Sequence, residues 1–123
     1  MNAVMIMRRW TGRVRSSDAD AYVAYVVSTG GDEYRSVPGN LGYQVLRRDL
    51  GNDETEISTV SWWSSWDAIK TFAGPEPALA RYYPEDDRYL IQRPERVEHF
   101  EVAAGSVPGA VDEGSGAPES GGA

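Results

Sequence analysis

Apolar and polar side chains alternate along residues 4–14, which predicts a β-strand. One face of this strand would carry Ile6, Arg8, Trp10 and Val14, and the other Met5, Met7 and Thr11. Arginine on both faces, at Arg8 and at Arg9, indicates a partly polar surface. Gly12 inside a strand is typical of a bulge or of a close approach by another group, and we expect a bulge.

The apolar spacing changes to three and four residues after Ser16, Ser17 and Asp18, which can cap a helix. Its apolar positions would be Ala19, Tyr22, Val23, Val26 and Val27. Gly30 and Gly31 are expected to end or break this helix, and residues 32–35 could add one further turn. The turn signal Pro38-Gly39-Asn40 then leads into a second strand over residues 42–50.

Gly51, Asn52 and Asp53 have the composition of a hairpin turn, so the second strand and the strand ending at Trp63 should pair antiparallel. A helix follows almost at once. Ser64 or Ser65 can cap it, Trp66, Ile69 and Phe72 recur at a spacing of three, and Gly74-Pro75 ends it. A strand that runs straight into a capped helix implies that the helix folds back over the sheet.

Residues 78–82 are predicted to form a short helical turn followed by a loop, and residues 96–102 a last strand. Beyond it, residues 104–123 are rich in glycine and lack aromatic side chains, so we expect a disordered tail. The chain is therefore divided into one folded domain, residues 1–103, and a tail, residues 104–123.

The predicted order of elements is βαββαβ. Right-handed crossovers then favour an α+β fold of the ferredoxin-like kind, with one antiparallel sheet and both helices on one face. The other face of the sheet needs a cover, and in a chain of 123 residues the economical cover is a second copy. A homodimer is expected.

Composition excludes several classes of function. The formal net charge is -7, from 12 basic and 19 acidic side chains, so there is no electrostatic footprint for nucleic acid. Cysteine is absent, which excludes disulfides and thiolate chemistry and is compatible with a reducing cytoplasm. The chain shows no signal peptide or membrane span, so a cytoplasmic protein without a membrane partner is expected. A single histidine and the lack of a glycine-rich phosphate loop give no support for a metal or nucleotide cofactor.

The stretches SVPGNLGYQVLRRD and WWSSWDAIKTFAG, together with the βαββαβ order, resemble the antibiotic biosynthesis monooxygenase family. The resemblance covers about residues 5–102, and its most similar motif is Trp63, Ser65, Ala68 and Phe72. It implies a dimeric α+β barrel made of two ferredoxin-like units. That family includes cofactor-independent oxygenases of polycyclic phenols and quinols, haem-degrading proteins and members without known activity, so the fold alone does not define the chemistry.

His99, on the last predicted strand, is the candidate catalytic residue because its unperturbed pKa lies near neutrality. As a general base it would take a proton from a phenol or an anthrone-like carbon acid, leaving an anion that can give one electron to O2. The alternative is a structural histidine within the sheet or at a dimer contact.

Four further residues are candidates for substrate binding: Trp63, Tyr83, Trp10 and Arg9. The two indoles would form apolar walls for an aromatic ring, although tryptophan is also a core residue. Tyr83, next to Tyr82 in the polar loop, could donate a hydrogen bond to a carbonyl or a peroxide. Arg9 could stabilise a phenolate, with a salt bridge to Glu98 or Glu101 as the alternative.

The sequence thus predicts a monooxygenase that oxidises a small aromatic substrate, such as a phenol, quinol or anthrone, with O2 and without a cofactor. The alternative is a dimeric barrel without catalytic activity that binds a small ligand or a partner. A cavity between sheet and helices with His99 at its wall would favour the first, and a filled core would favour the second.

Overall fold

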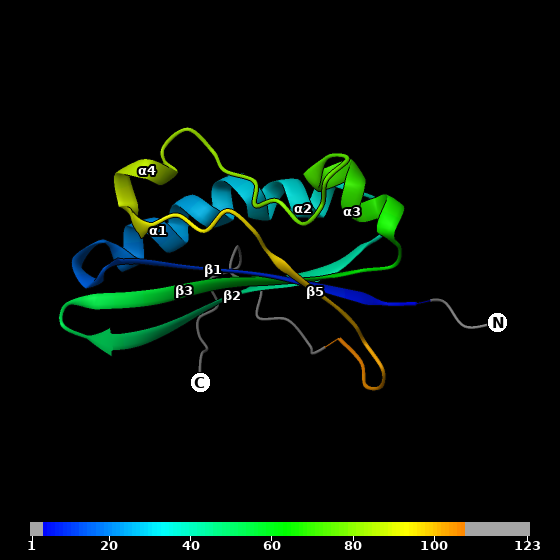
Figure 1. Ribbon diagram of the computed structural model, residues 1–123, viewed down its shortest axis with the longest axis horizontal. Coiled ribbons are helices and arrows are strands. Elements are labelled where there is room, and N and C mark those ends of the chain that lie inside the picture. The colour runs from blue at the N-terminus through cyan, green and yellow to red at the C-terminus, as the bar shows by residue number, and fades with distance from the viewer. Residues whose placement is uncertain (1–3, 108–123) are drawn as a thin grey trace.

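A single antiparallel sheet carries the helices on one face in the computed structural model, which describes residues 4–107 (Figure 1). The strands are β1 (Ile6–Arg15), β2 (Asn40–Gly51), β3 (Glu54–Trp63), β4 (Leu90–Gln92) and β5 (Glu98–Glu101). The sheet order is β2-β3-β1-β4, and β5 also pairs with β1, so β4 and β5 share one edge of β1. This is the predicted α+β, ferredoxin-like fold, with its last strand divided in two.

The helices are α1 (Ala19–Val26), α2 (Asp32–Ser36), α3 (Trp66–Ala73) and α4 (Asp86–Tyr89). A short 3-10 turn, Ser16–Asp18, precedes α1, and a π-helical turn, Val27–Gly31, joins α1 to α2. Of the two predicted caps, Ser64 and Ser65, it is Ser65 that caps α3, because its Oγ accepts a hydrogen bond from the amide of Ala68 at 3.1 Å. The hairpin between β2 and β3 turns at Asn52 and Asp53, which both have positive φ, as a two-residue turn of type I′ requires.

The buried face of β1 is the predicted one, with Ile6, Arg8, Trp10 and Val14 all under the helices. The expectation of a bulge at Gly12 was wrong for the pairing with β3, because Gly12 stays in register opposite Ile57. The close approach comes instead from Trp10, since a Cβ at Gly12 would lie 2.6 Å from its ring. The absence of a side chain at Gly12 therefore leaves space for the Trp10 indole.

The expectation that Gly30 and Gly31 end or break the first helix was correct only in part, because they interrupt the regular α-helix without ending it. The helix continues through both as a π-helical turn, and the predicted turn at residues 32–35 extends it as α2. Both glycines are buried, and a Cβ at Gly31 would lie 2.5 Å from the hydroxyl oxygen of Tyr43. Glycine here allows β2 and the helix to approach each other closely.

Residues 78–82 do not form the predicted helical turn. Their backbone bonds instead to the segment before β5, with the amide of Ala80 donating to Glu95 O at 2.8 Å and the amide of Val97 donating to Ala78 O at 2.9 Å. The helix in this region is α4, and it leads into β4, where the sequence predicted only a loop. Backbone hydrogen bonds to a segment distant in the sequence here override the local preference for a helical turn.

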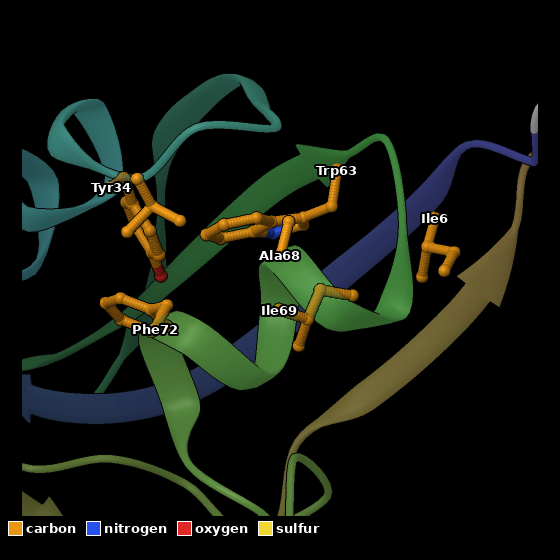
Figure 2. Packing of buried hydrophobic residues seen from close by; sticks show 7 residues of the cluster. Ile6, Tyr34, Trp63, Ala68, Ile69 and Phe72 are labelled. Atoms are coloured by element: carbon orange, nitrogen blue, oxygen red, sulfur yellow. The ribbon is translucent and has the colours of Figure 1, made fainter.

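The core has two clusters between sheet and helices. One surrounds Trp63, whose indole packs with Tyr34, Ala68, Ile69 and Phe72 (Figure 2). The other surrounds Trp10, with Val14, Tyr22 and Ile57 among its members. Of the predicted tail, residues 108–123 lie outside the described residues, and Val107 lies beside Gly42 of β2.

Candidate functional site

A small cavity of about 50 Å³ lies between the sheet, the first helix and the loop after α3. Six of the residues that line it are aromatic, and charged side chains or threonines come from β1, β3, the π-helical turn, the loop after α3 and the start of α4. The residues that line it are Arg8, Trp10, Tyr22, Val26, Thr29, Gly30, Tyr34, Thr59, Phe72, Arg81, Tyr82, Tyr83, Asp86 and Val97. π-Helical turns are frequent at functional sites, and this one supplies Thr29 and Gly30 to the wall.

Arg8 brings a buried positive charge to the cavity, since only 3% of the residue is exposed. Its Nη2 donates to the backbone oxygen of Leu79 at 3.2 Å, and its guanidinium lies 5.5 Å from the centre of the Phe72 ring. Its Nε is buried without a hydrogen-bond partner. Burial lowers the pKa of Arg8, but an arginine stays protonated at neutral pH.

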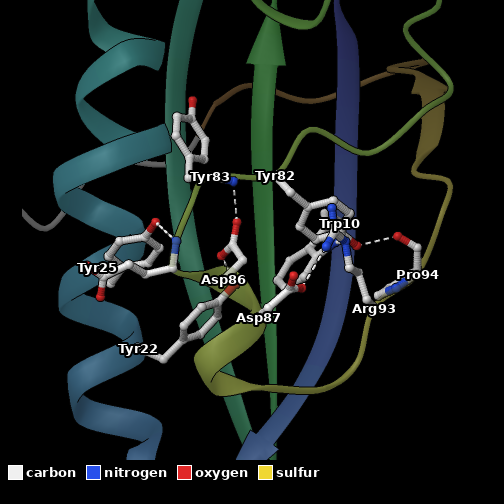
Figure 3. Close-up of polar contacts among 10 residues, drawn as sticks. Trp10, Tyr22, Tyr25, Tyr82, Tyr83, Asp86, Asp87, Arg93 and Pro94 are labelled. Atoms are coloured by element: carbon white, nitrogen blue, oxygen red, sulfur yellow. Dashed lines mark hydrogen bonds and ion pairs between the residues drawn. The ribbon is translucent and has the colours of Figure 1, made fainter.

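Asp86 is the buried carboxylate of the cavity (Figure 3). It accepts a hydrogen bond from the Tyr22 hydroxyl at 2.8 Å and one from the backbone amide of Tyr83 at 2.6 Å. Burial, together with the charge of Asp86, raises the pKa of Tyr22 well above its usual range. Tyr22 is therefore a neutral donor that holds the start of α4 against α1.

Tyr82 links the cavity wall to the segment before β5. Its hydroxyl accepts a hydrogen bond from Trp10 Nε1 at 3.0 Å and donates one to the backbone oxygen of Pro94. The guanidinium of Arg93 lies 4.2 Å from the centre of its ring (Figure 3). These contacts fix the orientation of the Trp10 indole.

Tyr83, Glu33 and Arg81 form the rim of the cavity. The Tyr83 hydroxyl donates to one carboxylate oxygen of Glu33 at 2.6 Å, and Arg81 donates to the other at 2.6 Å. Arg81 also donates to the backbone oxygen of Phe72 at 2.6 Å. Burial and the hydrogen bond to Glu33 raise the pKa of Tyr83, so its phenol is protonated at neutral pH.

Of the side chains that the sequence singled out for substrate binding, Trp10 and Tyr83 line this cavity. Trp63 does not. It lies in the other core cluster, where its Nε1 donates to Ser61 Oγ at 2.8 Å. Arg9 lies on the opposite face of the sheet and makes the predicted alternative contact, a salt bridge to Glu98 at 2.6 Å.

His99 is half-buried on β5, directly opposite Arg8 on β1, but it is not among the residues that line the cavity. Its ring lies 4.9 Å from the Trp66 indole, and its Nε2 is buried without a hydrogen-bond partner. Burial, with the charge of Arg8, lowers the pKa of His99 to about 4. The imidazole is therefore neutral at physiological pH.

Sequence reasoning did not single out Arg8, Asp86 or Glu33. The alternation along β1 did place Arg8 on the same face as Ile6 and Trp10, and a cation among core residues is a signal for a polar site. Asp86 and Glu33 give no such signal, because each lies in a segment rich in charged residues.

Within residues 4–107, no group of three or more histidine, aspartate and glutamate side chains is arranged to hold a metal ion. Over the same residues, no helix is long and apolar enough to cross a membrane.

Solved structures with this fold include proteins named as monooxygenases. A Bacillus cereus protein with the provisional name antibiotic biosynthesis monooxygenase is 19% identical, with a TM-score of 0.56 over 87% of this chain and 100% of that one. A Streptomyces coelicolor monooxygenase, solved in complex with nanaomycin D, is 15% identical, with a TM-score of 0.54 over 87% of this chain and 94% of that one.

A heme-degrading protein from Mycobacterium tuberculosis is 19% identical, with a TM-score of 0.50 over 88% of this chain and 100% of that one. No protein-family model matches the sequence, and no curated protein is similar to it. At these identities the likeness establishes the fold that the chain shares with the antibiotic biosynthesis monooxygenases, and the same fold carries more than one activity.

Proposed function

We propose that this protein, which has the fold of structures named antibiotic biosynthesis monooxygenases, oxidises a small aromatic substrate with O2 and without a cofactor. The observation that carries the proposal is the cavity, whose walls are aromatic and whose interior faces a buried guanidinium and a protonated phenol. Aromatic walls with a few convergent polar groups suit an aromatic ligand that carries oxygen substituents.

The chemistry of a phenol, quinol or anthrone needs an anion first, because an electron-rich anion can pass one electron to O2. For an anthrone-like carbon, the two radicals combine to form a C–O bond, and the peroxide takes up a proton. Loss of the remaining C–H proton then breaks the O–O bond, which gives a carbonyl and one water. The substrate supplies all four electrons, and a cation in a dry site stabilises the anion.

Two groups are candidates to receive the substrate proton. His99 is neutral at physiological pH but lies beside the cavity rather than in its wall. Glu33 is hydrogen-bonded to the Tyr83 hydroxyl, so a proton given to the Tyr83 oxygen could pass on to Glu33. Proton transfer requires hydrogen-bond reach. The Tyr83 hydroxyl is within that reach of Glu33 at 2.6 Å, whereas the route to His99 needs a bridging group.

The cavity is smaller than the roughly 300 Å³ or more of typical ligand pockets, so a ring must displace side chains when it enters. The rim is suited to this because the side chains of Tyr83 and Arg81 bond to Glu33 and, for Arg81, to the backbone oxygen of Phe72 on α3, and not to the sheet. These contacts can separate while the β1–β3 ladder stays intact.

The test is oxygen uptake by the purified protein with quinols and anthrones, in the absence of added flavin and metal. With ¹⁸O2, one labelled atom should enter the product carbonyl and the other should leave as water. No uptake above the protein-free rate with any of these substrates would contradict the proposal.

A second candidate function is binding of a small aromatic ligand without catalysis. It is favoured by the position of His99 outside the cavity and by the engagement of both nearby carboxylates in hydrogen bonds. Saturable binding of the same compounds without oxygen uptake would select this alternative.

A further inference from the structure

We infer that the ligand of this cavity presents an anionic oxygen to Arg8, so the molecules that bind are aromatic anions, namely carboxylates or phenolates. The inference rests on the proposed function only in taking the cavity as the place where an aromatic ligand binds.

The charge on Arg8 is uncompensated within residues 4–107. Seven other arginines there make salt bridges of 3.0 Å or less to a carboxylate: Arg9, Arg13, Arg47, Arg48, Arg81, Arg88 and Arg93. Their side chains are 36% to 70% exposed. Arg8 combines the opposite features, because it is 3% exposed and pairs with no described carboxylate.

The carboxylates nearest the cavity are already engaged. Asp86 accepts from Tyr22 and from the amide of Tyr83, and Glu33 accepts from Tyr83 and Arg81. A turn of either side chain toward Arg8 would leave those donors without acceptors. The cation therefore stays available to a ligand.

A buried charge without a counter-ion is costly to the folded protein, so an incoming anion gains more there than at the surface. Nε of Arg8 has no acceptor, and a hydrogen bond between ionised partners is roughly twice as strong as a neutral one. A neutral ligand of the same shape would contact the aromatic walls but leave the charge of Arg8 without a counter-ion.

Arg8 also has contacts that a purely structural residue would make, because Nη2 bonds to the oxygens of Leu79 and Pro77 and the guanidinium lies on Phe72. These contacts support the loop after α3. Because these contacts do not depend on the charge of the ligand, a purely structural Arg8 would give no preference for anions, whereas an Arg8 that binds the ligand would.

The experiment compares benzoate with benzamide, which share ring and shape but differ in charge, by titration calorimetry on the full chain at neutral pH. We expect benzoate to bind at least about 10-fold more tightly, a preference that corresponds to about 1.4 kcal/mol. Arg8→Gln should abolish this preference and leave the affinity for benzamide within about twofold. Arg48→Gln, which removes an exposed arginine of β2, is the matched control and should keep the preference for benzoate.

A phenol provides a second measurement, for which the variant is not required. Binding to the unaltered protein should lower the pKa of 1-naphthol, so that phenolate absorption develops at least about one pH unit below its position in buffer. Equal binding of benzoate and benzamide, together with an unshifted naphthol, would overturn the inference while leaving the aromatic site in place. If none of the three compounds binds, both the inference and the proposed site are wrong. Retention of the benzoate preference in a folded Arg8→Gln protein would also overturn the inference.

Discussion

The hydroxyl of Tyr22 on α1 donates a hydrogen bond to the carboxylate of Asp86 at the start of α4, 64 positions away in the sequence, and both residues are buried. The bond joins the first helix to the loop that closes the cavity. The same carboxylate also holds the amide of Tyr83, so one buried charge orients two walls of the site.

Tyr22→Phe should lower the free energy of unfolding by about 1 to 3 kcal/mol, because it leaves a buried carboxylate with one donor fewer. Chemical denaturation measures the loss. Tyr25→Phe is the control. It should cost less, because the Tyr25 hydroxyl accepts its hydrogen bond from the amide of Glu85 at an exposed position. In the Asp86→Asn background the cost of Tyr22→Phe should shrink, and full additivity would show that the two residues are not coupled.

His99→Gln should leave oxygen uptake within about threefold of the unaltered protein, well short of the roughly 100-fold cost of a lost general base. The reason is its position outside the cavity wall, against Trp66. Steady-state oxygen consumption is the measurement. A loss of about 100-fold in a variant of unchanged stability would establish His99 as the base instead.

The same residue predicts a pH dependence of stability. The pKa of His99 falls from its ordinary 6.5 to about 4 in the folded protein, so between these values the unfolded chain binds a proton that the folded protein does not. The free energy of unfolding should therefore decrease as the pH falls through this window, by about 1 to 3 kcal/mol from this group after the shift is discounted for the partial solvent exposure of the ring. Denaturation curves for His99→Gln should lack that part of the decrease. Parallel curves for both proteins would contradict the shift.

Glu33→Gln should loosen the rim of the cavity, because the amide cannot form the ion pair with Arg81. We expect benzoate to associate faster, by about twofold to tenfold, while the free energy of unfolding changes by only about 0.5 kcal/mol, since the pair is partly exposed. Stopped-flow tryptophan fluorescence gives the rate, and Arg88→Gln, which removes the exposed pair with Glu85, is the control. An unchanged association rate would show that the rim does not limit entry.

The sheet face away from the helices is predicted to form a homodimer interface. Leu46 on β2 and Phe100 on β5 belong to that face and are 49% and 42% exposed. An obligate interface would bury roughly 2,000 Å² or more in total. Sedimentation should give a dimer for the unaltered protein and a monomer for Leu46→Glu, whereas Lys70→Glu on α3 should remain dimeric. A monomer at micromolar concentration in the unaltered protein would refute the prediction.

The sequence by itself determined the elements whose pattern is local. Alternation in β1 assigned Ile6, Trp10 and Val14 to the buried face. Ser64 or Ser65 marked the start of α3, and Gly51-Asn52-Asp53 marked the hairpin. Each of these signals arises from neighbouring residues, through the period of the side chains or through a cap or turn. The order of such elements was enough to give the ferredoxin-like topology.

Only the tertiary structure decided how distant segments meet. Gly30 and Gly31 look like a helix end, yet the helix continues through both, and Gly31 leaves the space that the Tyr43 hydroxyl occupies. The segment around Ala80 pairs with residues before β5 instead of forming a helical turn. No local period encodes either contact.

The residues that line the cavity are likewise brought together by contacts between segments that are distant in the sequence. The sequence could place Trp10 and Tyr83 on a strand and a loop, but their shared wall depends on how that loop packs over the sheet. The register of β5 set His99 opposite Arg8, yet only packing made Arg8, and not His99, a wall residue. A residue's face is set by backbone periodicity, whereas its neighbours are set by side chains that lie many positions away.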